Sequence, residues 1–423
     1  MTSPHRRTFP PAAVFGTALA LSMPVHPAAA ATFQTLHAFG GSDGFASQTP
    51  LVADASGNLY GTAAEGGSSN RGVVFELSPP GTSGGAWTYT VIHNFGGATD
   101  GADILGGLAF NAFGTLFGTS YMGGTADQGM IYALVPPKTE GAAWTQPRLF
   151  NFGPSNLTGY WPASGLVFRS GKFYGTASYG GSNEGGLVFA LVPPTGTGQP
   201  WTESVLYDFQ AYGSGDGYSP QAGLAFDSKD NIYGTTISGG ANSNGAVFEL
   251  SPVTGGGWTE TVIYSFGEQA NDGSLPHGPL LPGAGGVLYG TTSQGGTAGA
   301  GTVFELVPGS GGWTEKILYS FANNNIDGIG PQGPLAIDST GRIYGATPFG
   351  GTKAFGTIFR LTPGTTLPWT ETVVHNFSAG TDGSTPYSGV YLGANGTIYG
   401  TTSAGGAGPD QRWGYGTVYA YTP

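Results

Sequence analysis

The chain has 423 residues, contains no cysteine and carries a formal net charge of −12. The lack of cysteine excludes disulfides, thiolate metal sites and a cysteine nucleophile, and the acidic balance argues against nucleic acid and anionic membranes as partners. Only 9% of the residues are charged whereas 13% are aromatic. The aromatic content argues against disorder, because disordered chains have too little apolar surface to collapse.

The first element in chain order is a predicted signal peptide over residues 1–31. It has a basic start at Arg6 and Arg7, an apolar stretch from Pro11 to Met23, and small residues around Ala30 for cleavage. The apolar stretch is too short to anchor the chain in a bilayer, and no later stretch is long and apolar enough. We therefore predict a protein without a transmembrane segment that is secreted, extracellular or periplasmic. The Arg6-Arg7 pair leaves both the general secretory and the twin-arginine routes open.

Residues 32–423 are predicted to form one domain that is built from a single repeat. An aromatic residue followed by Gly-Thr, or by Gly-Ala in one copy, ends a short apolar run at intervals of 55 to 59 residues. A period of this kind predicts a repeat architecture. The aromatic residues that mark the seven copies are Tyr60, Phe117, Tyr174, Tyr233, Tyr289, Tyr344 and Tyr399.

Each copy contains four short runs of β-branched and aromatic residues that are separated by Gly, Asn and Pro. In copy four these runs are 224–226, 231–235, 247–250 and 258–266. Such runs are typical of antiparallel strands, and four strands per repeat predict the blade of a propeller. The sequence therefore predicts an all-β fold, a seven-bladed β-propeller with four antiparallel strands per blade.

The two ends of the repeat array predict how the ring closes. Residues 32–39 match a fourth strand, whereas the sequence stops at 419–423, directly after a third strand. We expect the N-terminal strand to complete the last blade and to pair with the C-terminal strand. A blade shared in this way covers strand edges that would otherwise be exposed.

Three recurring motifs resemble those of a known family. They are Tyr-Gly-Thr-Thr-x-x-Gly-Gly, Gly-x-Val-Phe-x-Leu-x-Pro and Trp-Thr-Glu-Thr-Val-Leu-Tyr-x-Phe, and they are clearest at 233–266 and 289–321. The chain resembles the GloVer tandem-repeat family over essentially all of residues 32–423. The resemblance implies a secreted or surface-attached bacterial repeat protein and brings no catalytic residues. Many members end in a sorting or anchoring segment, whereas this sequence ends in a strand, so attachment to a cell surface is left open.

One face of the predicted propeller is expected to carry function. The loops from fourth to first strand and from second to third strand share that face, and propeller function resides in such loops. The first kind of loop carries Asp-Gly in six copies. A turn in which Asp bonds backbone amides explains this motif, and the competing interpretation is a carboxylate ring that holds Ca²⁺. We favour the turn and predict no cofactor and no metal. The six aspartates are Asp43, Asp100, Asp216, Asp272, Asp327 and Asp382.

Two copies depart from the pattern and supply the candidate ligand-binding residues. Copy three replaces Asp-Gly by Leu157-Thr158-Gly159-Tyr160-Trp161, and copy seven has ten residues, 407–416, where the others have five. The residues before each Gly-Gly pair vary between copies, which fits a position free of packing. Aromatic, Arg and Asp side chains can stack on a sugar and bond its hydroxyls, although unused surface or a cover for the ring seam explains them equally. The candidates are Tyr121, Tyr160, Trp161, Tyr179, Asp410, Arg412, Trp413 and Tyr415.

Other chemically suggestive residues are interpreted as structural. His37, His93 and His375 occupy an aromatic packing position of the fourth strand. The fourth-strand glutamates are expected to be solvated on the outer strands, and the fourth-strand tryptophans to pack between blades. These glutamates are Glu203, Glu260, Glu315 and Glu371, and the tryptophans are Trp87, Trp144, Trp201, Trp258, Trp313 and Trp369.

The sequence contains no recognisable catalytic motif apart from the residues of the repeat pattern itself. We therefore predict a monomeric binding or scaffold module, with glycan as the favoured ligand and a polysaccharide or cell-surface component as partner. The alternative is a secreted carbohydrate-active enzyme, a hydrolase or lyase, which needs two carboxylates or a His/Tyr pair close together. The residues considered for that role are Asp103, Asp127, Glu184, Asp410 and His277.

Overall fold

The computed structural model describes residues 31–423 except 83, 98, 140, 154–157, 197–198, 407 and 409–413. The predicted signal peptide up to residue 30 lies outside the described residues. Within the described part, no helix has the length and apolar character needed to cross a bilayer.

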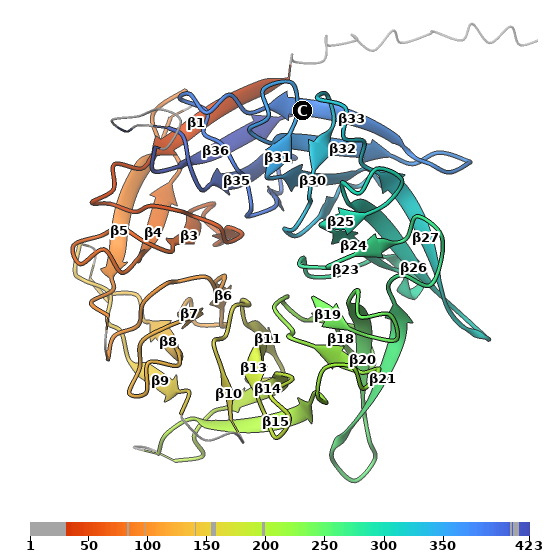
Figure 1. Cartoon of the computed structure of the whole chain (residues 1–423). Coiled ribbons are helices and arrows are strands. Elements are labelled where there is room, and N and C mark those ends of the chain that lie inside the picture. The colour runs from red at the N-terminus through yellow and green to blue at the C-terminus, as the bar shows by residue number, and fades with distance from the viewer. Residues whose placement is uncertain are drawn as a thin grey trace, which may run out of the picture. The chain divides into compact units, whose positions relative to one another are not determined.

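Residues 32–423 form a ring of seven antiparallel sheets with four strands each, as predicted (Figure 1). In every blade the first strand lies nearest the axis and the fourth lies outermost. The first three blades are β2 (Val52–Ala53), β3 (Leu59–Ala63), β4 (Val73–Ser78) and β5 (Thr88–Asn94); β6 (Ala109–Phe110), β7 (Leu116–Ser120), β8 (Met130–Leu134) and β9 (Arg148–Asn151); and β11 (Val167–Arg169), β12 (Lys172–Ala177), β14 (Leu187–Val192) and β15 (Thr202–Asp208).

The next three blades repeat this order, and a short 3₁₀ turn, η1 (Ala284–Gly286), joins the first two strands of blade five. These blades are β17 (Ala225–Phe226), β18 (Ile232–Thr236), β20 (Ala246–Pro252) and β21 (Trp258–Ser265); β23 (Leu281–Pro282), β24 (Leu288–Thr292), β26 (Thr302–Gly309) and β27 (Gly312–Ser320); and β29 (Ala336–Ile337), β30 (Ile343–Thr347), β32 (Thr357–Thr362) and β33 (Thr370–Asn376).

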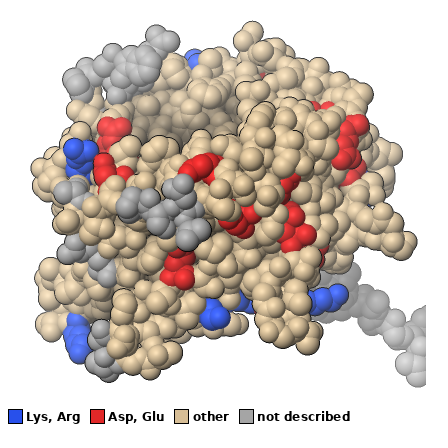
Figure 2. Space-filling view, turned by 60° about the horizontal axis from the view of Figure 1, so that its bottom comes forward, with Lys and Arg blue, Asp and Glu red and all other residues tan. Residues whose placement is uncertain are grey.

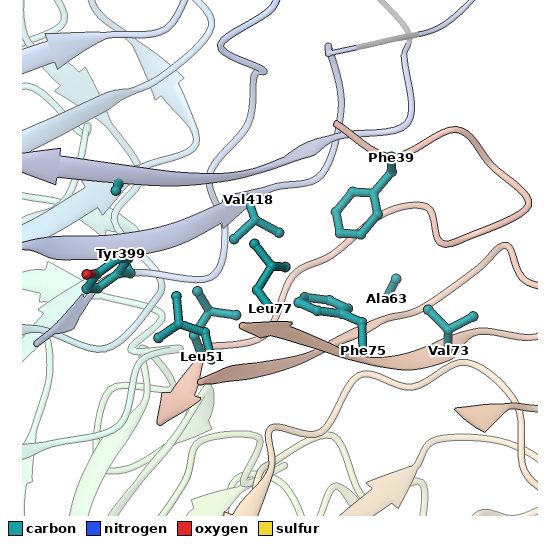
Figure 3. Close-up of a cluster of buried hydrophobic side chains, with 10 residues drawn as sticks. Phe39, Leu51, Ala63, Val73, Phe75, Leu77, Tyr399 and Val418 are labelled. Carbon is teal, nitrogen blue, oxygen red and sulfur yellow. The ribbon is translucent and has the colours of Figure 1, made fainter. Parts of the chain in front are cut away.

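The seventh blade closes the ring with strands from both ends of the array. It consists of β34 (Tyr391–Leu392), β35 (Ile398–Thr402), β36 (Thr417–Thr422) and β1 (Thr32–Ala38). β1 pairs antiparallel with β36, and Thr32 lies opposite Thr422, which confirms the predicted closure. A buried cluster that includes Phe39, Phe75 and Val418 packs blade seven against blade one at this seam (Figure 3). Burial of these large apolar side chains is the main force that holds the seam closed.

The aromatic-Gly-Thr marker has a packing reason for each of its last two residues. A Cβ on Gly234 would lie 2.4 Å from Cζ of Phe248, a fully buried ring of the neighbouring strand. Only glycine leaves room for that ring. The following threonine joins two blades, because Thr176 Oγ1 donates to the carbonyl of Ala222 at 3.2 Å. The marker therefore recurs because it builds the core and the blade interface together.

The fourth-strand tryptophans pack between blades, as predicted. The ring of Trp313 lies 5.8 Å from that of Tyr233 in the preceding blade, and Trp87 lies 6.0 Å from Tyr399 across the seam. Centroid distances of this size, at steep angles, are favourable edge-to-face contacts.

The prediction that the fourth-strand glutamates are solvated is wrong. Glu315 is only 7% exposed, and its carboxylate accepts hydrogen bonds from the Tyr264 hydroxyl at 3.2 Å and the Gln269 amide at 2.6 Å. Its side chain faces the outer strand of the preceding blade rather than solvent. Burial raises the pKa of Glu315 to about 8 and, for the same reason, the pKa of Glu203, Glu260 and Glu371 to about 7.

The Asp-Gly motif completes these buried contacts and acts as a turn. One carboxylate oxygen of Asp272 accepts the Tyr264 hydroxyl at 2.8 Å and the Gly267 amide at 2.6 Å, and the other accepts the Gly273 amide at 2.7 Å. We call three such Tyr–Asp–Glu groups the inter-blade acid clusters. They are Tyr207, Asp216 and Glu260; Tyr264, Asp272 and Glu315; and Tyr319, Asp327 and Glu371.

Histidine takes the tyrosine position at other interfaces, which confirms its packing role. His37 bonds Asp43 at 2.9 Å and stacks on Tyr89 with ring centroids 3.7 Å apart. His375 likewise bonds Asp382 at 3.2 Å and stacks on Phe33. Copy three lacks the aspartate, and there the Glu203 carboxylate accepts the backbone amide of Gly159 instead. The outer interfaces therefore use either tyrosine or histidine against the aspartate, and copy three uses a backbone amide in place of the aspartate contact.

Candidate ligand-binding face

The loops from fourth to first strand and from second to third strand pair with each other on one face, which we call the loop face. In four blades they form two-stranded ribbons, and in the others Phe45–Glu65, Ala102–Met122 and Ser384–Ala404 form single bridges. This pairing confirms that the two loops share a face. The ribbons are β10 (Gly159–Tyr160) with β13 (Tyr179–Gly180), β16 (Gly217–Tyr218) with β19 (Ser238–Gly239), β22 (Gly273–Ser274) with β25 (Gln294–Gly295), and β28 (Gly328–Ile329) with β31 (Phe349–Gly350).

One position of the loop face has a left-handed backbone in every blade. At Trp161, for example, φ is 57°, which is uncommon for a residue other than glycine. The Trp161 amide donates to the Gln128 carbonyl of the preceding blade at 3.0 Å, so main-chain bonds hold the conformation whatever the side chain. The side chain is thereby free to vary. The seven residues are Ala46, Asp103, Trp161, Ser219, Leu275, Gly330 and Thr385.

Four of the predicted site residues meet in one group on this face. Trp161 stacks on Tyr121 with ring centroids 5.6 Å apart, and it meets Tyr160 and Tyr179 edge-on at 5.1 and 5.6 Å. Tyr218 of the next blade lies 6.3 Å from Tyr179. We call these five residues the aromatic cluster. All five rings are half-buried, so each keeps part of its surface exposed to solvent.

Two carboxylates flank the aromatic cluster. The Tyr160 hydroxyl donates to Glu184 Oε2 at 2.6 Å, and burial together with this bond raises the pKa of Tyr160 to about 12. The Tyr121 amide donates to the Asp103 carbonyl at 3.0 Å, so Asp103 is next to Tyr121, and burial raises the pKa of Tyr121 together with the nearby Tyr179 and Asp103. Tyrosine hydroxyls and carboxylates together supply donors and acceptors beside apolar ring surfaces.

The other four candidates are Asp410, Arg412, Trp413 and Tyr415. Asp410, Arg412 and Trp413 lie outside the described residues. Tyr415 packs edge-on against Phe45 of blade one at 5.6 Å, and its carbonyl accepts the Ala46 amide, so it belongs to the ring seam rather than to the aromatic cluster.

Asp127 and His277, which were considered for catalysis, have separate surroundings. Asp127 accepts the amide of Gly123 at 2.9 Å and closes a turn. It also lines a pocket of about 490 Å³ between blades one and two, together with Arg71 and Met122. His277 lies on the central channel. The described residues include no group of three or more His, Asp or Glu that could hold a metal ion.

Sequence reasoning missed the left-handed position and the contribution of Tyr218. The signal available was a fixed offset, because in five copies the left-handed residue stands directly before a proline, as in Trp161-Pro162 and Ser219-Pro220. Acidic side chains are prominent on the side of the ring brought forward in Figure 2, whereas Lys and Arg lie towards its edges. Such a surface disfavours anionic ligands.

The comparisons with known proteins bear on the family and the fold. The profile described as Gloeobacter/Verrucomicrobia repeat matches residues 24–225 and 162–419. No curated protein matches the sequence significantly.

Similar solved structures share 11–14% sequence identity with the chain, which shows the propeller fold alone. One is provisionally assigned as a 6-phosphogluconolactonase from Bacteroides uniformis, with TM-score 0.52 and 14% identity over 81% of this chain and 88% of that one. Another is an ancestral GH74 enzyme, with TM-score 0.57 and 14% identity over 93% of this chain and 51% of that one. A third is the extracellular domain of a provisionally assigned one-component system from B. thetaiotaomicron, with TM-score 0.52 and 11% identity over 92% of this chain and 40% of that one.

Proposed function

The chain belongs to the Gloeobacter/Verrucomicrobia repeat family, and on this premise we propose that it is a secreted propeller that binds glycan through the aromatic cluster. Residues 1–31 act as its signal peptide and residues 32–423 as the binding domain. A structural neighbour that is an extracellular domain is consistent with this location.

The observation that carries the proposal is the convergence of four aromatic side chains from three loops. Tyr121 comes from blade two, whereas Tyr160, Trp161 and Tyr179 come from two different loops of blade three. Large aromatic rings left half-exposed in one patch are typical of a binding surface rather than of a core.

The polar groups at the cluster favour a sugar over a purely apolar ligand. A sugar ring offers an apolar C–H face for stacking and hydroxyls around its edge. Glu184 and Asp103 provide acceptors for such hydroxyls, and the Tyr160 hydroxyl lies beside Glu184. The net charge of −12 favours neutral glycans over polyanionic ones.

A carbohydrate-active enzyme, a hydrolase or lyase, is the second candidate. One observation favours it, because the aromatic cluster has a carboxylate at two of its rings, Glu184 at Tyr160 and Asp103 at Tyr121, and glycoside hydrolysis requires two carboxylates beside the bound sugar. Two structural neighbours are also enzymes by their descriptions.

A glycan array probed with residues 32–423, followed by product analysis on every hit, tests the proposal. We expect binding without cleavage that is lost in Tyr179→Ala. Phe113→Ala is the matched control, because Phe113 is 88% exposed on a turn of the opposite face. Released oligosaccharides would support the enzyme, and binding that survives Tyr179→Ala would contradict the site.

The copy-seven loop remains a proposed second contact. Trp413→Ala on the same array separates its contribution from that of the aromatic cluster. Loss of binding in Trp413→Ala but not in Tyr179→Ala would move the site to blade seven.

A further inference from the structure

The mouth of the central channel carries one side chain from each blade at the same level of the ring. They lie at the loop-face ends of the innermost strands and line a pocket of about 280 Å³. Leu105 and Ala163 form an apolar arc of this ring. The polar members are Gln48, Gln221, His277, Gln332 and Tyr387.

Several of these polar groups have no protein partner. Within the described part of the chain, the His277 imidazole, the Gln332 amide and the Tyr387 hydroxyl make no hydrogen bond to protein. The edge-on contact of Tyr387 with Phe349 at 5.9 Å holds its ring in place. Half-buried donors and acceptors that converge on a pocket are satisfied by whatever occupies it.

The pocket lining carries no Asp, Glu, Lys or Arg. Burial lowers the pKa of His277, so its imidazole is neutral at neutral pH. An ionic ligand would therefore lose its hydration without gaining a counter-charge. The volume lies just below the ~300–1,000 Å³ that is usual for small-molecule sites, which limits the occupant to a single small ring.

We propose that the channel mouth is a second ligand site that takes one neutral sugar residue. The amide, imidazole and phenol groups bond its hydroxyls, and the arc of Leu105 and Ala163 contacts its C–H face. The site needs no residue of the aromatic cluster, so it stands even if that cluster binds no glycan. Ala163 follows Trp161 by two residues, so the two sites adjoin on the loop face.

Saturation-transfer NMR titrations of residues 32–423 with glucose, galactose, mannose and glucuronate test the channel site. We expect at least one neutral sugar to bind, and glucuronate to bind at least about tenfold more weakly. Gln332→Leu and His277→Leu should each weaken the neutral sugar by about tenfold, because each removes hydrogen bonds to it.

Two controls separate this site from the proposed function and from misfolding. Phe113→Ala changes an exposed turn residue that belongs to neither site and should leave binding of the neutral sugar unchanged. In Tyr179→Ala, any neutral sugar that still binds reports the channel mouth, so binding that is weakened in Gln332→Leu but persists in Tyr179→Ala separates this site from the aromatic cluster. Thermal unfolding of each variant checks that the propeller is intact. Failure of all three neutral sugars to bind, equal binding of glucuronate, or full binding by intact Gln332→Leu and His277→Leu would overturn the proposal.

Discussion

The inter-blade acid clusters and the aromatic cluster both place a tyrosine hydroxyl against a carboxylate. In the first, Tyr264 donates to Asp272 at 2.8 Å inside a buried interface. In the second, Tyr160 donates to Glu184 at 2.6 Å on a half-exposed patch. The first arrangement occurs at three interfaces with the same residue types, whereas the second occurs in one blade. In a ring of repeats, a contact that recurs in register builds the ring, and a contact made once is available for a ligand.

The largest loss of stability is expected from a substitution that removes a recurring core contact. Phe248→Ala removes a fully buried ring from the core and should lower the free energy of unfolding by about 3–5 kcal/mol. Chemical denaturation measures this loss. If the folded fraction of the variant still binds glycan with the wild-type affinity, the core contact contributes to stability but not to ligand binding. A parallel loss of affinity would contradict this.

A change of pH should alter the stability of the protein through the inter-blade acid clusters. The pKa of Glu315 is raised to about 8 in the folded protein, so folding favours its protonated form. This stability is present below the unfolded-state pKa and is lost as the pH rises through about 8, by about 1.4 kcal/mol for each unit of the shift. The wild type should therefore be less stable at about pH 9 than at about pH 5.

Glu315→Gln should remove this part of the pH dependence and stabilise the protein at about pH 9 by on the order of 2 kcal/mol. Glu268→Gln is the control, because its carboxyl lies on the nearby surface. Urea unfolding at several pH values checks the difference, and a Glu315→Gln variant with an unchanged pH profile would show that Glu315 is ionised when folded.

Trp161→Ala tests whether a residue of the aromatic cluster contributes to ligand binding without contributing to stability. Blade one already has Ala46 at the equivalent left-handed position, with φ of 56°, so the backbone tolerates alanine there. We expect glycan affinity to fall by about 5- to 150-fold, that is by about 1–3 kcal/mol, with little change in stability. Calorimetric titration measures the affinity. Leu275→Ala at the same position of blade five should not alter it.

The smallest effect is expected from one hydroxyl. Tyr160→Phe removes the bond to Glu184 and should weaken glycan binding by about 0.5–1.5 kcal/mol. Tyr218→Phe is the matched control, because Tyr218 holds the equivalent position in blade four. Equal losses in both variants, measured by the same titration, would mean that Glu184 has no special part in binding.

The fold could be predicted where residues recur in register, and could not be predicted where the surroundings of a side chain depend on the neighbouring blade. Tyr60 and its equivalents located the second strands because the Gly after them makes room for a ring of the same blade and the Thr bonds the next blade, and these contacts recur around the ring. Glu315 was expected on the surface because an outermost strand has one face directed away from its own blade. In the ring that face lies against the preceding blade, and the carboxyl becomes buried.

For the candidate site, the sequence indicated the residues but not their neighbours. Tyr121, Tyr160, Trp161 and Tyr179 stood out because they depart from the repeat, and the fold brings them together. Tyr218 follows an ordinary Asp-Gly pair and so does not stand out from the repeat. Only its distance to Tyr179 assigns it to the aromatic cluster.

The sequence by itself determined the number of blades, the strand order and the closure by Thr32–Ala38, because each depends on local patterns that recur at one period. The tertiary structure alone decided which side chains face the neighbouring blade and which converge on the loop face and the channel. Those contacts join residues about one repeat apart, and their distances depend on how the blades are arranged around the axis, which no local pattern encodes.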